Sequence, residues 1–169
     1  MDLMQAIRDR ASVRSYSSRP VPEELVRAVV QAGICAPSAN DSRPWQIVVV
    51  REEAMRRRLA DTHQWARFAA QAPVILVVCG DRQRSDTFWI EDTSAATQNM
   101  LLAAHALGLG SCWIAIRGDD EDNERKVRDT LGIPEHMGVL AILPLGYPER
   151  PPSARPERNP APHLHQERW

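Results

Sequence analysis

The sequence is poor in lysine, in net charge and in long hydrophobic runs, and each shortage excludes a class of protein. Lys126 is the single lysine among 21 basic residues, and 22 acidic residues bring the formal net charge to −1. No overall positive potential is available to hold nucleic acid or an anionic membrane. No apolar run approaches the ~20 residues of a membrane span, and the charged N-terminus lacks a hydrophobic signal segment. We therefore expect a cytoplasmic protein without nucleic-acid or membrane partners.

Signatures of metal sites, nucleotide loops and catalytic nucleophiles are missing as well. The chain has no Walker A loop, no HExxH and no nucleophile elbow, and its GLGSC stretch does not follow a strand as a dinucleotide fingerprint does. The cysteines are odd in number and far apart, which predicts buried thiols in a reducing compartment instead of disulfides or a metal site. They are Cys35, Cys79 and Cys112. His105 lies in an apolar helical pattern, which is more typical of packing than of catalysis.

Length and hydrophobic periodicity predict one domain, residues 1–169, that mixes helices and strands. Helices are expected at 2–9, 22–33, 52–61, 64–72, 90–107 and 121–131, and strands at 45–50, 73–80, 111–116 and 139–145. Pro22 suits the first position of its helix, and Gly33 suits its end. The continuous apolar run 73–80 indicates a central strand buried on both faces. The helix 90–107 is apolar around most of its circumference, which predicts a core or subunit-interface helix.

Residues 147–169 form a proline-rich tail that ends in a bulky group, Leu164 to Trp169. An extended tail of this kind reaches about 65–70 Å at ~3.1 Å per residue, whereas the domain should have a radius of gyration of about 15 Å. The tail is long enough to cross a partner subunit. Docking on such a partner is the preferred interpretation, and a frayed end is the alternative.

An early arginine- and serine-rich stretch is the first candidate binding element. Arg10 and Arg14 are four residues apart with Ser12 between them. At the end of a helix, two guanidinium groups and a hydroxyl can converge on one phosphate. The same residues can also form a solvated surface stripe, and the pattern alone does not choose between the two.

The turn APSANDSRPWQ, residues 36–46, is the second candidate. Pro37 fixes the chain after a helix, and Ser38 and Asn40 offer polar side chains before the strand that begins at Trp45. Such a turn can bring backbone N–H groups and an amide against the edge of a planar heterocycle. Taken by itself, an ordinary helix-to-strand loop is the simpler interpretation.

Five blocks taken together resemble the nitroreductase-like flavoproteins. RASVRSY, APSANDSRPWQIVVV, EDTSAATQNMLLAAHALGLGSCWI, LGIPE and LGYP follow one another in that family's order and cover nearly the whole chain. The resemblance implies an α+β, three-layer fold in which helices flank a mixed central sheet, and a C-terminal tail that wraps around the dimer partner. It also implies an obligate homodimer with FMN at the subunit interface and NAD(P)H as co-substrate.

The same resemblance implies the site residues. Arg10, Ser12 and Arg14 would grip the FMN phosphate and ribityl chain, and backbone groups at Leu109 and Gly110 would approach the isoalloxazine. Along the flavin of the other subunit would lie Pro37, Ser38, Ala39 and Asn40. Arg158, or else Arg155, would complete the phosphate site. Arg43 stands where the family often has glutamine, and as a cofactor-binding residue it would favour the anionic reduced flavin or an acidic substrate; the alternative is that it only meets solvent. No metal and no catalytic side chain are implied, because flavin N5 carries the chemistry.

The implied activity is ping-pong hydride transfer from NAD(P)H to a small electron acceptor such as a quinone or a nitroaromatic. The segment 82–89 is shorter than the insertion that many members use as a substrate lid. Two alternatives stay open: an FMN-binding protein without turnover, which would serve storage or sensing, and a specialised branch that performs dehalogenation or flavin cleavage.

Overall fold

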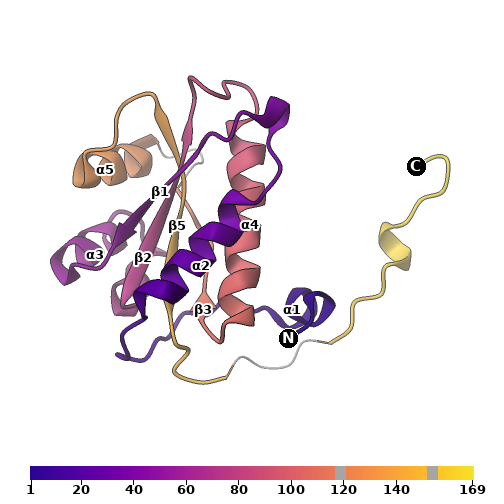
Figure 1. Ribbon diagram of the computed structural model, residues 1–169, viewed down its shortest axis with the longest axis horizontal. Coiled ribbons are helices and arrows are strands. Elements are labelled where there is room, and N and C mark those ends of the chain that lie inside the picture. Colours follow the sequence, from indigo (N-terminus) through magenta and orange to yellow (C-terminus); the bar gives the residue numbers. More distant parts are fainter. Residues whose placement is uncertain (117–120, 152–155) are drawn as a thin grey trace.

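A five-stranded sheet forms the middle layer of the protein (Figure 1). The structure is a computed structural model that describes residues 1–116, 121–151 and 156–169. The strand order is β1-β2-β5-β3, and β4 also pairs with β5; every one of these ladders is antiparallel. A parallel bridge between Ser12 and Ser111 makes the sheet mixed at the β3 edge. The strands are β1 (Trp45–Val50), β2 (Val74–Asp81), β3 (Gly110–Ser111), β4 (Ile114–Ala115) and β5 (Met137–Gly146).

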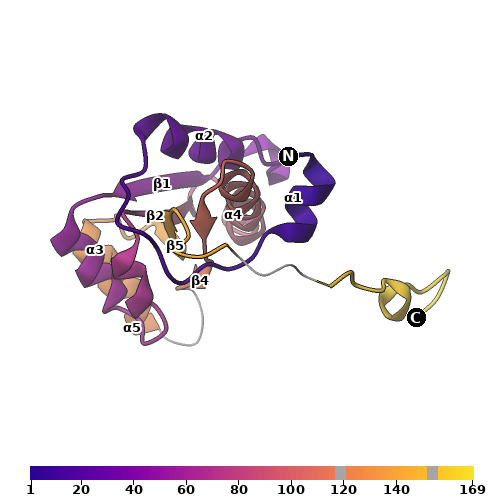
Figure 2. The same ribbon diagram turned by 90° about the horizontal axis from the view of Figure 1, so that it is seen from below.

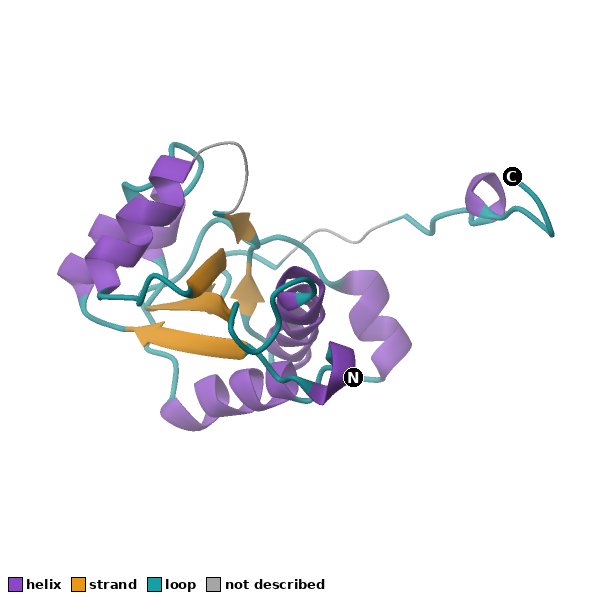
Figure 3. Ribbon diagram, turned by 90° about the horizontal axis from the view of Figure 1, so that it is seen from above, coloured by secondary structure: helices purple, strands orange, loops and turns teal. Residues whose placement is uncertain are grey.

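Helices cover both faces of this sheet, which confirms the predicted three-layer α+β fold (Figure 3). The helices are α1 (Leu3–Asp9), α2 (Glu23–Ile34), α3 (Glu53–Ala60), α4 (Trp89–Ala106) and α5 (Glu121–Leu131). α2 and α4 pack on one face, and α3 and α5 pack on the other. Among the described residues, none of the helices combines the length and the hydrophobicity that crossing a bilayer requires.

The strand β2 is buried on both faces, as its apolar run predicts. Residues 74, 76 and 78 pack into the core beneath α2 and α4, whereas residues 75, 77 and 79 pack into the core beneath α3 and α5. This division follows from the two-residue period of a strand. Burial raises the pKa of Cys79 to about 12, so this thiol stays protonated.

Three details differ from the predictions for the helices. Pro22 caps α2 from the position before its first residue, and Gly33 lies inside the last turn of α2. A Cβ at Gly33 would lie 2.7 Å from Cγ of Met100, so glycine serves the close packing of α2 on α4 instead of ending the helix. Cys35, expected to be buried, is exposed because it follows the last turn of α2 and faces away from the core.

Two further elements are shorter than predicted. Within 64–72 only a 3-10 helix forms, Arg67–Gln71, because His63 accepts the Trp65 N–H through its side chain and starts a tight turn before it. The predicted strand 111–116 is divided into β3 and β4, which keep the same register against β5. In that register Cys112 would face Pro144, which has no N–H to donate to a ladder.

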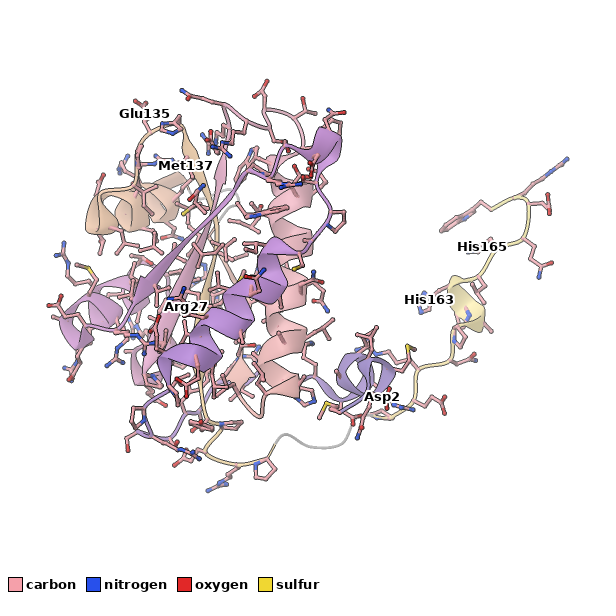
Figure 4. The ribbon with its side chains drawn as sticks, viewed as in Figure 1. Asp2, Arg27, Glu135, Met137, His163 and His165 are labelled. Carbon is pink, nitrogen blue, oxygen red and sulfur yellow. The ribbon has the colours of Figure 1, made fainter. Side chains whose placement is uncertain are left out.

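The described end of the tail, 156–169, stands apart from the rest of the chain (Figures 1 and 2). It contains one short 3-10 helix, Ala161–His163, and Figure 4 shows His163 and His165 along it. Leu164 is largely exposed and Trp169 is fully exposed, although His165 and Trp169 stack on each other. The apolar end of the tail is therefore uncovered in the single chain.

Candidate functional site

The segment from Arg10 to Ser17 lies along the β3 edge of the sheet. Ser12 forms the parallel bridge to Ser111, and the Val13 N–H donates to the Ser111 carbonyl at 2.9 Å. A Cβ at Gly110 would lie 2.8 Å from the Val13 side chain, so only glycine permits this close approach. The backbone contacts thus hold the predicted arginine–serine cluster beside the predicted glycine turn.

Tyr16 fixes the other end of this segment. Its hydroxyl donates to the Val13 carbonyl at 2.6 Å, and its backbone pairs with Pro148. The Ser17 N–H donates to the Tyr147 carbonyl at 2.9 Å. Burial raises the pKa of Tyr16, so the phenol stays neutral and remains a donor. The segment is therefore locked between β3 and the first residues of the tail.

Two cavities meet at Arg14. A polar cavity of about 300 Å³ is lined by Ser12, Val13, Arg14, Ser15, Glu149 and Arg150. An aromatic cavity of about 540 Å³ is lined by Arg14, His63, Trp65, Phe68 and residues 112–115. Arg14 belongs to both linings, so a ligand with an anionic end and a flat ring can occupy both cavities with Arg14 between its two parts.

The electrostatics around Arg14 favour an anion. Among the described residues Arg14 forms no ion pair, and its guanidinium carbon lies 6.0 Å from the centre of the Phe68 ring. The nearby Glu149 instead accepts a hydrogen bond from Ser15. Burial raises the pKa of Cys112, and the charge of Arg14 only partly opposes this effect. Cys112 is therefore a neutral thiol in the wall of the cavity and not an activated nucleophile.

Arg10 and Leu109 line a third, smaller cavity of about 190 Å³ near the C-terminal end of α4. Leu109 is buried, and it presents its side chain to the core. His105 lines the same cavity, and its Nε2 atom is buried without a hydrogen-bond partner among the described residues. Burial lowers the pKa of His105, with the charge of Asp9 opposing. This neutral, partly buried imidazole agrees with the packing role expected from the sequence.

The second predicted element, the turn from Pro37 to Arg43, lies at the opposite end of α4 (Figure 1). It contains a short 3-10 helix, Ala39–Asp41. α4 has 18 residues, so its two ends are ~27 Å apart. Within one chain the structure brings Arg10, Ser12 and Arg14 together with the Leu109–Gly110 turn, and it leaves Pro37, Ser38, Ala39, Asn40 and Arg43 away from them.

Of the remaining predicted cations, the two that the structure describes, Arg43 and Arg158, are exposed. Arg43 forms a bidentate ion pair with Asp41, 2.8 Å for each contact, and this hydrogen bonding raises the pKa of Arg43. Arg158 is exposed on the tail. Arg155 lies outside the described residues. The single chain thus does not place Arg158 at a site.

The aromatic wall is the part of the site that sequence reasoning missed. Trp65 is 71% exposed although it borders a cavity, and Phe68 and Trp113 complete the wall beside it. The spacing of Trp65 and Phe68, three residues apart, was a possible signal. It indicates a helix face equally well, and only the fold brings Trp113 from the β3–β4 connection to the same place.

Comparison with known proteins shows which family this chain resembles. The sequence matches the profile of the Nitroreductase family over residues 7–67 and 60–147. It is 40% identical over 171 residues to a putative NADH dehydrogenase/NAD(P)H nitroreductase of Methanothermobacter thermautotrophicus, an alignment that covers all of this chain and 88% of the relative.

Solved structures agree with the sequence match. A putative NADH dehydrogenase/NAD(P)H nitroreductase from Parabacteroides distasonis superposes with a TM-score of 0.94 at 35% identity, covering 99% of this chain and 98% of the other. A putative nitroreductase from Desulfovibrio desulfuricans, crystallised in complex with FMN, superposes with a TM-score of 0.87 at 31% identity, covering 100% and 98%. With the profile spanning most of its length and these relatives matching end to end, the chain belongs to the nitroreductase family.

Proposed function

We propose that the chain forms a homodimeric flavoenzyme that transfers electrons by a ping-pong mechanism from NAD(P)H to a small acceptor such as a quinone or a nitroaromatic. As a member of its family it is an NAD(P)H-dependent oxidoreductase that uses FMN, in line with the relatives named NAD(P)H nitroreductase and the FMN complex of the Desulfovibrio protein. The observation that carries the proposal is the polar cavity that adjoins an aromatic cavity across Arg14.

The residues around these cavities fit FMN. A phosphate requires cationic and hydroxyl donors, and Ser12 and Arg14 supply both at the polar cavity. Arginine is suited to this task because its planar fork can donate two parallel hydrogen bonds to phosphate oxygens. A flat heterocycle requires apolar and aromatic walls, which Trp65, Phe68 and Trp113 provide.

The protein's own part in the reaction is binding, orientation and exclusion of water. When bound, FMN supplies hydride transfer between NAD(P)H and the acceptor at its N5 atom. Arg10, Ser12 and Arg14 would hold the phosphate and the ribityl chain, and the aromatic wall would line the space for the ring. Burial raises the pKa of Cys112, so the thiol in this cavity stays neutral and would not serve as a nucleophile.

A second subunit is part of the proposal, because one chain separates its two candidate elements. The turn 37–43 and the cluster around Arg14 lie at opposite ends of α4. In a homodimer the turn of one subunit can lie against the flavin that the other subunit holds. An apolar surface on α1 supports association, since Leu3, Met4 and Ile7 are all exposed.

The tail would complete this assembly. Its end carries an uncovered Leu164 and Trp169, which gain most from burial against a partner. Arg158 lies between the domain and this apolar end, so a tail that crosses the partner can deliver a further cation to the phosphate. We also assign the protein to the cytoplasm, in keeping with three free thiols.

Anaerobic reduction tests the function directly. Purified protein loaded with FMN is mixed with NADH or NADPH, and the flavin absorbance is followed before and after addition of a nitroaromatic or a quinone. We expect bleaching by one or both nicotinamides and recovery on addition of the acceptor, with parallel double-reciprocal plots in the steady state. An oxidised spectrum that persists with both nicotinamides would contradict the proposal and favour a flavin-binding protein without turnover.

A further inference from the structure

A buried carboxylate stands at the end of α4 that faces the turn 37–43. Asp92, in the first turns of α4, is 5% exposed, and among the described residues it forms no ion pair. A buried carboxylate without a cation is costly unless hydrogen bonds satisfy it. The N-terminal end of a helix lowers part of that cost through its dipole. The remaining cost has to be met by specific donors.

Those donors come from two separate segments. The Ala39 N–H donates to Oδ1 of Asp92 at 2.8 Å, and the Ser42 hydroxyl donates to Oδ2 at 3.2 Å. The Ser85 hydroxyl donates to the same Oδ2 atom at 3.0 Å. One carboxylate therefore ties the turn 37–43 to the segment 82–89, which leads into α4.

The turn that Asp92 holds has an unusual backbone. Asn40, Asp41 and Arg43 have φ values of 53°, 53° and 48°, in the left-handed region. Asn and Asp tolerate this region, but arginine is disfavoured there. Such conformations persist where the surrounding structure enforces them, and they concentrate at ligand-binding sites. The Ser38 hydroxyl, which accepts the Arg43 N–H at 3.0 Å, adds a second restraint inside the turn.

We infer that Asp92 is a positioning residue: its carboxylate holds the turn 37–43 and the segment around Ser85 in the one arrangement that contacts the flavin of the second subunit. This inference rests on the proposed function, since it assumes that the turn contacts FMN. A purely structural Asp92 would stabilise the domain and have no further effect on the cofactor. A positioning Asp92 sets cofactor affinity and the environment of the flavin as well.

Asp92→Asn separates the two roles in the full-length, FMN-loaded protein. Asparagine keeps the size and one carbonyl acceptor for Ala39, but it removes the charge, and its amide nitrogen can only donate, so both serine hydroxyls have to turn from donors into acceptors. We expect the FMN dissociation constant to rise about tenfold and the visible absorption bands of the bound flavin to shift. The matched control is Thr97→Val, because Thr97 is fully buried in α4 and its hydroxyl donates to the Thr93 carbonyl of the same helix.

The outcomes are distinct. The inference is supported if Asp92→Asn binds FMN more weakly and shows shifted flavin bands. Thr97→Val should then keep an FMN dissociation constant within about twofold of wild type, although its melting temperature falls by a similar amount. Equal FMN affinity and identical spectra in the two variants overturn it. If Asp92→Asn does not fold, Ser42→Ala decides by the same titration, with about threefold weaker binding expected and an unchanged constant overturning the inference. Wild-type protein that binds no FMN at all would overturn the proposed function itself.

Discussion

Replacing Arg14 with alanine is the sharpest test of the cofactor site. Arg14 lines both the polar and the aromatic cavity, and a hydrogen bond to a charged group contributes about 1.5–3 kcal/mol. Because Arg14 is exposed and has no ion-pair partner among the described residues, its removal leaves no buried group unsatisfied, so the loss should not exceed this range. FMN binding should therefore weaken roughly 10- to 150-fold.

The assay is titration of the FMN-free protein with FMN, followed by quenching of flavin fluorescence. Arg19→Ala is the matched control: it removes the same charge from a nearby position, but Arg19 stacks over the Tyr147 ring at 4.0 Å and lines neither cavity. Arg14→Lys should give an intermediate affinity, since it keeps the charge and loses the planar fork. If Arg14→Ala binds FMN within about twofold of Arg19→Ala, the cluster is a solvated stripe and the reasoning is wrong.

Stopping the chain after Tyr147 should weaken both FMN binding and the dimer; sedimentation showing an unchanged dimer with unchanged FMN affinity would refute the docked tail. Glu124→Gln should lower the free energy of unfolding by about 2 kcal/mol, because it removes the negative charge at the oxygen that accepts hydrogen bonds from two arginines and from the Val139 N–H. Asp122→Asn, on an exposed ion pair of the same helix, should lower the free energy of unfolding much less because solvent screens that pair, and equal urea midpoints for these two variants would contradict the difference. Burial lowers the pKa of His105 below 6.5, so below that pH the unfolded chain binds more protons and the protein loses stability. The urea midpoint should fall less in His105→Gln than in wild type when the pH is lowered from above to below 6.5. Equal falls in the two proteins would exclude this linkage.

Local patterns were sufficient where an element depends on its own residues. The apolar run at 73–80 predicted β2, and the long alanine- and leucine-rich stretch at 90–107 predicted α4, because burial on both sides of a strand or around a helix imposes its composition on the chain. Predictions failed where a distant residue decides. Pro144 on β5 interrupts the strand predicted at 111–116, and Met100 on α4 explains Gly33.

The candidate site divides in the same way. The sequence by itself determined which residues bring cationic and polar groups to the site. Arg10, Ser12 and Arg14 are close together in the chain, and the order of the five blocks can be recognised from the sequence alone. Only the tertiary structure decided that this cluster borders an aromatic wall, since Trp65 and Trp113 line one cavity although they are far apart in the chain. It also decided that the turn 37–43 lies at the other end of α4, held by Asp92. Chain order encodes which groups are present, whereas the distance between them depends on how helices and strands pack, and that packing is a property of the whole fold.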